Sequence, residues 1–132
     1  MTRPRNEVPG PRRPPRGWRR GRRGEALAAL WLRLKGYRIL ARGLKSPVGE
    51  IDIVARRGGT LAIVEVKRRA DRDAGTLAVA PRQQARIARA AAWLVGRRPD
   101  LAGAVIRFDI VLIAPGRLPR HLADAWRAPE RS

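Results

Sequence analysis

The chain has 132 residues, a length that suits a single domain with a modest core. Its 30 Lys and Arg residues against 11 Asp and Glu give a formal net charge of +19, which favours a polyanionic partner, with nucleic acid as the default and an anionic membrane surface or an acidic protein as alternatives. The absence of cysteine excludes disulfides and zinc–thiolate sites, and no apolar run is long enough to cross a bilayer.

The first segment, residues 1–23, is rich in Arg, Pro and Gly and shows no hydrophobic period, which predicts a disordered basic arm. The arm is either a solvated tail or an attractor of phosphates, with Trp18 available to stack on a base. Its paired arginines resemble an export signal, but the stretch that follows them carries charges and reads as an amphipathic helix. We therefore expect a cytoplasmic protein.

Apolar residues then recur at helical spacing, and Gly36 stands where a C-terminal glycine belongs, which predicts a helix over residues 24–35. Glu25 would lie in the first turn of this helix. An acidic side chain is favourable there because the N-terminal end of the helix dipole is positive. That electrostatic role is sufficient to explain Glu25 without a function.

Three short strands are predicted next, and a loop over 43–47 separates the first two: 37–42, 50–56 and 60–67. The second and third strands flank Gly58-Gly59, a typical signal for a two-residue hairpin turn. We therefore expect these two strands to pair antiparallel.

Pro81 is well placed to open a second helix over residues 81–95, because proline is favoured in a first helical turn. Residues 105–113 (VIRFDIVLI) predict a fourth strand. Residues 119–126 (PRHLADAW) suggest a short C-terminal helix, with Trp126 packed onto the body.

The order α-β-β-β-α-β predicts an α/β fold with a small mixed central sheet flanked by helices. We divide the chain into the basic arm (1–23), a folded domain (24–127) and a short tail (128–132). No internal repeat is visible.

Ionisable residues interrupt the two apolar strands of the hairpin. If the turn is Gly-Gly, Asp52 lies directly opposite Glu65, and Glu50 lies directly opposite Lys67. All four side chains then point to the same face of the sheet, because side chains alternate along a strand.

Two directly opposed carboxylates repel each other and need a positive counter-charge. A divalent cation such as Mg²⁺ would supply it, and Lys67 could then orient a water molecule or stabilise the charge of a phosphate. The alternative is an ordinary ion-pair network, since the chain has 27 arginines, with Glu50 and Lys67 forming a plain cross-strand salt bridge. The clustering of ionisable groups on one face favours the metal site.

The helix, hairpin and second helix, together with the D-x(n)-E-x-K pattern, resemble the restriction-endonuclease-like PD-(D/E)xK nuclease superfamily. More narrowly, four stretches look like the YraN family of small bacterial proteins, which are regarded as endonuclease-like and related to archaeal Holliday-junction resolvases: RGEALAALWLRLKGYRILAR, GEIDIVAR, AIVEVKRR and RFDIVLI. The resemblance covers about residues 22–126 and leaves the basic arm outside.

The resemblance implies that Asp52 and Glu65 bind Mg²⁺ or Mn²⁺ and that Lys67 is the catalytic lysine. Glu25 matches an acidic residue of the first helix that joins the metal site in the resolvase-like relatives. The superfamily often has Pro before the motif Asp, where this chain has Ile51, as its close relatives do.

Further residues are candidates for nucleic-acid binding. Three arginines that directly follow the E-x-K strand are expected to hold phosphates beside the scissile bond: Arg68, Arg69 and Arg72. Gln84 matches a glutamine that some nuclease relatives carry in the second helix. Arg107 could contact a phosphate, although a structural pairing with Asp109 is favoured. His121 is expected at the surface or in a cap, away from the hairpin.

These observations predict a metal-dependent nuclease that hydrolyses phosphodiester bonds, with DNA favoured over RNA and branched or structured DNA as a candidate substrate. The alternative is a non-catalytic basic DNA- or RNA-binding module on a nuclease-like scaffold. No membrane partner is expected. A homodimer is expected only by analogy with junction-cutting relatives, which cut two symmetric strands.

Overall fold

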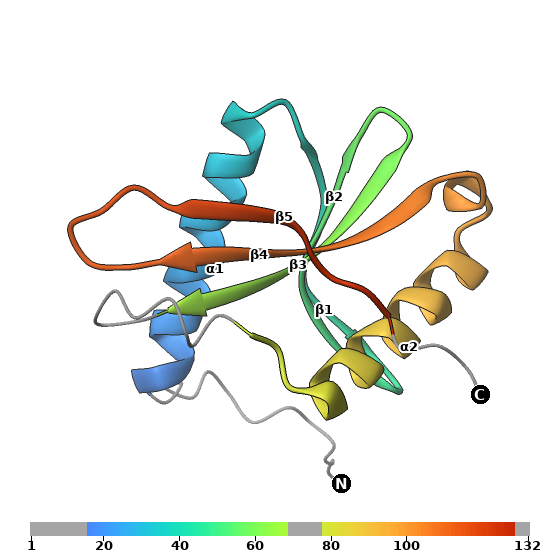
Figure 1. The fold of residues 1–132 in the computed structure, drawn as a ribbon, viewed down its shortest axis with the longest axis horizontal. Helices are drawn as coiled ribbons and strands as arrows, with labels where there is room; N and C mark the ends of the chain where they lie inside the picture. The colour runs from blue at the N-terminus through green and yellow to red at the C-terminus, as the bar shows by residue number, and fades with distance from the viewer. Residues whose placement is uncertain (1–15, 69–77, 129–132) are drawn as a thin grey trace, which may run out of the picture.

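The computed structural model describes residues 16–68 and 78–128, and for residues 16–23 only the backbone. The elements in this part of the chain are α1 (Arg16–Leu34), β1 (Arg38–Ser46), β2 (Gly49–Arg57), β3 (Thr60–Arg68), α2 (Pro81–Arg97), the short 3₁₀ helix η2 (Pro99–Leu101), β4 (Val105–Ile113) and β5 (Arg120–Trp126). The strands form one sheet in the order β1-β2-β3-β4-β5 (Figure 1).

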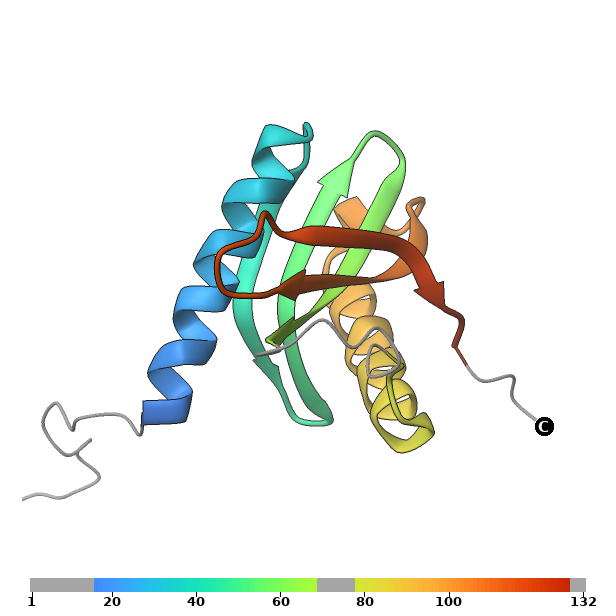
Figure 2. The same cartoon turned by 60° about the vertical axis from the view of Figure 1, so that its left-hand side comes forward.

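The two helices cover opposite faces of this sheet (Figures 1 and 2). On the α1 face, Ala28 and Leu32 of the helix pack in one cluster with strand residues such as Val64. On the α2 face, Ile87 and Leu94 pack in a second cluster. The architecture is therefore the predicted α/β fold, with a mixed sheet between two helical layers.

Alternation along β3 distributes its side chains between the two cores. Leu61 and Ile63 belong to the cluster under α2, whereas Ala62 and Val64 belong to the cluster under α1. Because side chains alternate along a strand, the same parity directs Glu65 and the residues at odd positions after it to the α2 face.

The pairing of β3 with β4 is parallel, whereas the other neighbouring strands are antiparallel. A parallel pair needs a crossover connection, and α2 lies within it. Pro81 opens α2 as predicted, and the helix extends to Arg97. The strand predicted over 105–113 is confirmed with the same bounds.

The first helix begins at Arg16, earlier than the predicted start at Gly24. Its first residues belong to the segment that we expected to be disordered. Arginine is a good helix former, and five of the eight residues from Arg16 to Arg23 are arginine, so this stretch can extend a helix that is anchored further along despite its two glycines. The prediction used the apolar period alone. The part of the predicted arm over 1–15 lies outside the described residues.

The first strand is longer than predicted and continues to Ser46, through most of the expected 43–47 loop. A bulge between Ile39 and Ala41 shifts its register against β2, and Gly43 has a positive φ of 60°. Such irregularities weaken the alternating pattern by which a strand is predicted.

The C-terminal helix predicted over 119–126 is wrong, because these residues form β5. The strand β4 is buried from Phe108 to Ile113, and without β5 it would be an apolar edge of the sheet. Pairing along this edge outweighs the weak local preference for a helix. Trp126 packs onto the body as expected, with its ring stacked 4.2 Å from that of Phe108.

Candidate functional site

The register of the central hairpin is as predicted from the Gly-Gly turn. Arg57 pairs with Thr60, and the ladder continues to Ile53 opposite Val64. Gly58 adopts a positive φ of 60°, which the tight turn requires. One further step along this register places Asp52 beside Glu65.

Asp52 lies where β2 leaves β3. From Gly49 to Ile51, β2 is paired with β1, and the ladder with β3 ends at Ile53. Beyond this point a side chain replaces the backbone as the partner of β3: Asp52 Oδ2 accepts a hydrogen bond from the backbone N–H of Val66 at 2.8 Å. The side chain is therefore fixed at the fork between the two strands.

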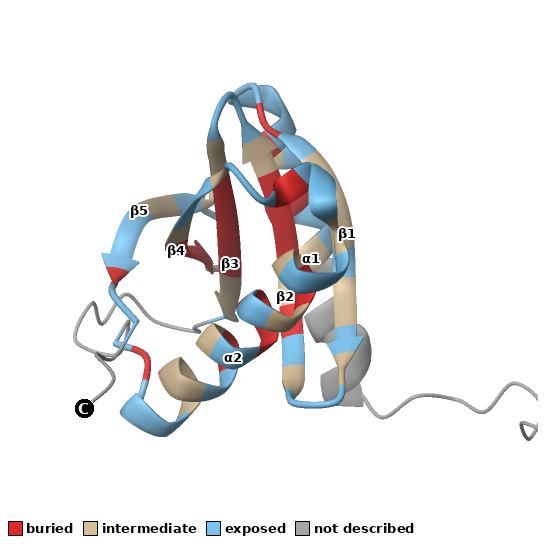
Figure 3. Ribbon diagram, turned by 90° about the vertical axis from the view of Figure 1, so that its right-hand side faces the viewer, coloured by how far each residue is buried: buried red, intermediate tan, exposed pale blue. Residues whose placement is uncertain are grey.

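The strand β3 becomes less buried toward its C-terminal end (Figure 3), and Glu65 is the first residue of that half-buried stretch. Burial, then the nearby charge of Asp52, raise its pKa to about 7, although Lys67 and a hydrogen bond with Gln83 act in the opposite direction. Burial also raises the pKa of Asp52, against the hydrogen bond from Val66. The protein therefore holds two carboxylates in a place where their ionised forms are disfavoured.

Within residues 16–68 and 78–128, no arginine forms an ion pair with Asp52, Glu50 or Glu65. The cation that lowers the pKa of both Asp52 and Glu65 is Lys67. The structure therefore brings the two acids and the lysine together as predicted. The ion-pair network that was the alternative is not seen in this part of the chain.

Glu25 and Glu50 approach the same region from α1 and β2. A Cβ atom built on Gly43 would lie 3.7 Å from Glu25 Oε1 and 4.0 Å from Glu50 Oε2. Gly43 lies in β1 between the residues that pair with Ile53 and Ile51, and hence beside Asp52. Two more carboxylates therefore border the Asp52–Glu65 pair.

The helix-dipole explanation for Glu25 is wrong. Because α1 begins at Arg16, Glu25 lies well inside the helix, and the first turn holds no acidic residue. Its position next to Gly43 gives it a place at the border of the acidic region instead.

Across the described ranges, no group of three or more His, Cys, Asp or Glu side chains is arranged to hold a metal ion. The chemistry of the donors nevertheless fits a hard divalent cation, since the nearby ligand groups are carboxylates without sulfur or imidazole. The raised pKa values of Asp52 and Glu65 indicate a deficit of positive charge between them, which such a cation would relieve. The residues present therefore fit Mg²⁺ or Mn²⁺.

The residues predicted to contact nucleic acid do not all lie beside the acidic pair. Arg68 is exposed at the end of β3, whereas Arg69 and Arg72 lie outside the described residues. The Nε2 atom of Gln84 donates to the carbonyl oxygen of Val79 at 3.0 Å, which ties the start of α2 to the preceding segment. Its neighbour Gln83 is the residue that reaches Glu65.

Sequence reasoning missed Gln83. Two consecutive glutamines at the start of α2 indicate that an amide could reach the site, but their side chains point in different directions on a helix. Only the packing of α2 on the sheet decides which of the two faces Glu65.

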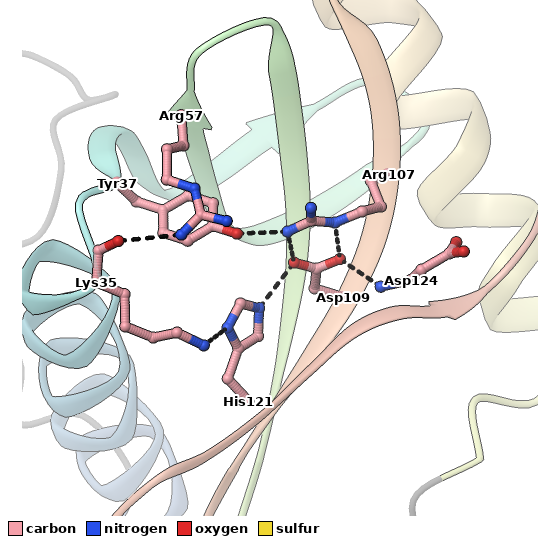
Figure 4. A network of polar contacts seen from close by, with 7 residues as sticks. All are labelled: Lys35, Tyr37, Arg57, Arg107, Asp109, His121 and Asp124. Atoms are coloured by element: carbon pink, nitrogen blue, oxygen red, sulfur yellow. Dashed lines mark hydrogen bonds and ion pairs between the residues drawn. The ribbon is translucent and has the colours of Figure 1, made fainter.

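Arg107 belongs to a second polar cluster, on the α1 face of the sheet (Figure 4). Its guanidinium donates to both carboxylate oxygens of Asp109, at 2.9 and 2.8 Å, and also to the hydroxyl of Tyr37. His121 Nε2 lies 2.8 Å from Asp109 Oδ2, and the N–H of Asp124 donates to Oδ1 at 2.9 Å. These contacts support the structural interpretation of Arg107.

We refer to these four residues, with Tyr37, as the Asp109 network. Burial opposes the charged form of Asp109, but hydrogen bonds from Arg107, His121 and the backbone of Asp124 outweigh it and lower the pKa of Asp109 to about 2. The expectation of a surface position for His121 is wrong, since its side chain is only 2% exposed. The histidine is away from the hairpin acids, as expected, and its role is to hydrogen-bond the buried carboxylate of Asp109.

Comparison with known proteins gives a consistent result. The model of the uncharacterised protein family UPF0102 matches residues 24–113. A UPF0102 protein of Parvibaculum lavamentivorans is 62% identical over 110 residues, which cover 83% of each chain. A UPF0102 protein of Paramagnetospirillum magneticum is 56% identical over 126 residues, which cover 92% of this chain and 98% of the relative.

The matched range contains the hairpin, α2 and β4, and hence both polar clusters apart from the residues of β5. The match confirms the YraN-like part of the resemblance, while the wider nuclease superfamily stays a prediction. Neither of the described helices combines the length and apolar character that crossing a membrane would require.

Proposed function

This chain belongs to the UPF0102 family, and we propose that it is a divalent-metal-dependent nuclease that hydrolyses phosphodiester bonds of nucleic acid, with DNA as the favoured substrate. The observation that carries the proposal is the pairing of Asp52 with Glu65 at the fork of β2 and β3. Burial raises the pKa values of both carboxylates, the charge of Glu50 adds to this at Asp52 and the charge of Asp52 adds to it at Glu65, and Lys67 is the cation beside them. Clusters of perturbed ionisable groups are a mark of functional sites.

Asp52, Glu65 and, by the same proposal, Glu25 would hold Mg²⁺ or Mn²⁺. When bound, such a cation lowers the pKa of a water molecule and offsets charge on a phosphate. The hydrogen bond from Val66 N–H fixes Asp52 Oδ2, so the orientation of its other oxygen is set before any ligand arrives. This preorganisation lowers the cost of binding.

As a proposed metal ligand, Glu65 would act in its ionised form, which a bound cation favours against the burial that raises its pKa to about 7 in the metal-free protein. Lys67 offers a positive charge on the same face for a phosphate oxygen. The net charge of +19 supplies long-range attraction for a polyanion, and the affinity should fall steeply with salt.

The proposal is tested with purified protein and a panel of linear, nicked and branched DNAs and RNA, in Mg²⁺ and Mn²⁺. We expect Asp52→Asn and Lys67→Ala each to reduce the cleavage rate by about 1000-fold, because several kcal/mol of transition-state stabilisation is lost. Asp100→Asn, at an exposed site near the Gly-Gly end of the hairpin and away from its acids, is the matched control and should keep full activity. Undiminished cleavage by the Asp52→Asn, Lys67→Ala double variant would contradict the assignment.

The second candidate is a basic nucleic-acid-binding module without turnover. It is favoured by the net charge of +19 together with the absence, among described residues, of a preassembled group of three metal ligands. Thermal unfolding with and without Mn²⁺ separates the two. A metal site stabilises the folded state by mass action, by about 2.7 kcal/mol at a concentration 100 times the Kd, and Asp52→Asn should remove this gain. A pure binding module shows no response that depends on Asp52.

A further inference from the structure

We propose that one flank of α2 is the surface that tracks the phosphodiester backbone of a duplex substrate, leading it to the acidic site. The inference rests on the proposed function for the role of the site. The α2 arginines that carry it are distinct from the residues that sequence reasoning selected for nucleic-acid binding.

Five residues of α2 recur at intervals of four, three, four and four positions, which keeps them on one face of a helix: Arg82, Arg86, Arg89, Trp93 and Arg97. We call them the α2 stripe. The four arginines are exposed and Trp93 is half-buried. The helix contains no Asp or Glu, so nothing along it offsets the positive charge.

The arginines of the α2 stripe differ from those with structural roles. Arg98 pairs with Asp100, and Arg107 is held by Asp109. In the part of the chain that the structure describes, Arg82, Arg86 and Arg89 make no hydrogen bond or ion pair through their side chains. Their guanidinium groups are therefore available to a ligand, and guanidinium is well suited to phosphate.

The α2 stripe begins next to the candidate site. Gln83, the neighbour of Arg82, is hydrogen-bonded with Glu65. Arg86 covers Gly49 at the turn between β1 and β2: a Cβ atom added to Gly49 would lie 3.1 Å from Arg86 Cγ and 3.3 Å from its carbonyl oxygen. A backbone that follows the stripe from Arg97 to Arg82 would therefore arrive at the acidic residues.

The length of the α2 stripe matches a run of phosphates. From Arg82 to Arg97 a helix rises by about 22 Å. One strand of a duplex carries a phosphate for about every 3.4 Å of axis, so this distance corresponds to about six phosphates. Four arginines spread over such a length suit a repeating linear polyanion.

An anionic membrane surface fits the α2 stripe less well. Interfacial helices present a large apolar face to the lipid, whereas the apolar face of α2 is already buried in the core, through Ile87, Ala90, Ala91 and Leu94. Trp93 is also engaged, since the guanidinium of Arg97 stacks 4.9 Å above its ring. The surface that remains exposed is charged and not apolar.

The test compares two triple variants in the Asp52→Asn background, with EDTA present, so that binding is measured without cleavage. In the first, Arg82, Arg86 and Arg89 are replaced by Gln. In the second, the matched control, three exposed arginines outside α2 are replaced by Gln: Arg33, Arg38 and Arg120. Both variants lose the same charge, and thermal unfolding verifies that both are folded.

The affinity for a short fluorescein-labelled duplex DNA is measured by anisotropy as a function of salt. Loss of three phosphate contacts should flatten the slope of log K against log salt by about 2.7, so between about 50 and 200 mM salt the α2 variant should lose about 40-fold less affinity than the parent. The control variant should keep the parental slope. Equal slopes for the two triple variants, or an unchanged slope for the α2 variant, would overturn the proposal.

The same proteins are titrated with vesicles of anionic phospholipid and with polyglutamate. If the α2 variant loses these interactions while its DNA affinity keeps the parental salt slope, α2 binds a membrane or an acidic protein and the proposal is wrong. Because binding is measured without metal, an α2-dependent salt slope combined with no cleavage by the wild-type protein in Mg²⁺ or Mn²⁺ would refute the nuclease proposal and leave this one standing.

Discussion

Each face of the sheet holds carboxylates among polar groups, and the pKa of Asp109 on the α1 face shifts in the opposite direction to those of Asp52 and Glu65 on the α2 face. On the α1 face, fully buried Asp109 accepts hydrogen bonds from Arg107, His121 and the backbone of Asp124, and its pKa falls to about 2. On the α2 face, Asp52 and Glu65 have raised pKa values, although both are less buried than Asp109.

The opposite pKa shifts are caused by the hydrogen-bond donors around each carboxylate and not by how deeply each carboxylate is buried. The protein supplies enough donors to stabilise the carboxylate of Asp109, so this charge is part of the folded structure. Among the described residues, Asp52 receives a backbone N–H, Glu65 receives Gln83, and both lie near Lys67, but these groups do not outweigh burial and both pKa values stay raised. A cluster that the fold leaves short of positive charge is suited to an external cation, which is why the α2 face carries the functional proposal.

The largest effect is expected for Asp109→Asn. The substitution removes the charge that pairs with Arg107 and His121 and leaves the guanidinium without its carboxylate in a mostly buried place. Breaking one partner of such a pair costs about 3–5 kcal/mol in the free energy of unfolding. Urea denaturation at neutral pH measures this loss.

The matched control for Asp109→Asn is Asp52→Asn, which makes the same chemical change on the other face. We expect it to leave the stability of the metal-free protein unchanged or higher, because it removes a charge that burial disfavours. If the two variants were equally destabilised, the contrast between the two faces would not hold.

A smaller effect, with a definite pH dependence, is expected for Glu65→Gln. The pKa of Glu65 rises from an ordinary 4.5 to about 7 on folding, so between these values the folded protein binds the proton more tightly than the unfolded chain does. This contribution to stability is fully present below pH 4.5 and is lost as the pH rises through 7. The glutamine has no such loss.

In EDTA, Glu65→Gln should therefore exceed the wild type in the free energy of unfolding by about 2 kcal/mol at about pH 8, and the difference should be near zero at about pH 4. Urea titrations at the two pH values provide the measurement. Asp109 acts with the opposite sign, since its lowered pKa gives stability that is lost as the pH falls toward 2. A difference that stays the same at both pH values would argue against a raised pKa of Glu65.

The smallest effects are expected for alanine substitutions of the two neighbouring glutamines, and they differ between the two positions. Gln84→Ala removes the hydrogen bond to the carbonyl of Val79 and should lower the free energy of unfolding by about 1 kcal/mol. Gln83→Ala should change the stability less and should raise the pKa of Glu65, because its hydrogen bond favours the ionised carboxylate. Carboxyl NMR titration reads out the second effect. An unchanged Glu65 titration in Gln83→Ala would remove Gln83 from the site.

The hairpin and its acidic face were predictable because their signals are local. The Gly-Gly turn sets the register between Ile53 and Val64, and alternation along each strand then places Asp52, Glu65 and Lys67 on one face. The start of α2 was predictable for the same reason, since Pro81 marks the first turn of a helix within its own sequence.

The errors fall where a distant partner decides the conformation. Residues 120–126 form a strand because the apolar edge of β4 is available to them, and that edge is not visible in their own sequence. His121 is buried because β5 carries it onto Asp109. The helix-dipole role assigned to Glu25 failed because α1 continues beyond the apolar period that was used to bound it.

The sequence by itself determined the α/β class, the hairpin register and the identity of the acids and the lysine, because periodicity and turn chemistry act over a few residues. The tertiary structure alone decided which charges the protein satisfies. It gave Asp109 its donors from β4 and β5, left Asp52 and Glu65 with few, and turned Gln83 toward the site instead of Gln84. Desolvation and charge pairing depend on the groups that surround a side chain in space, and these come from segments far apart along the chain.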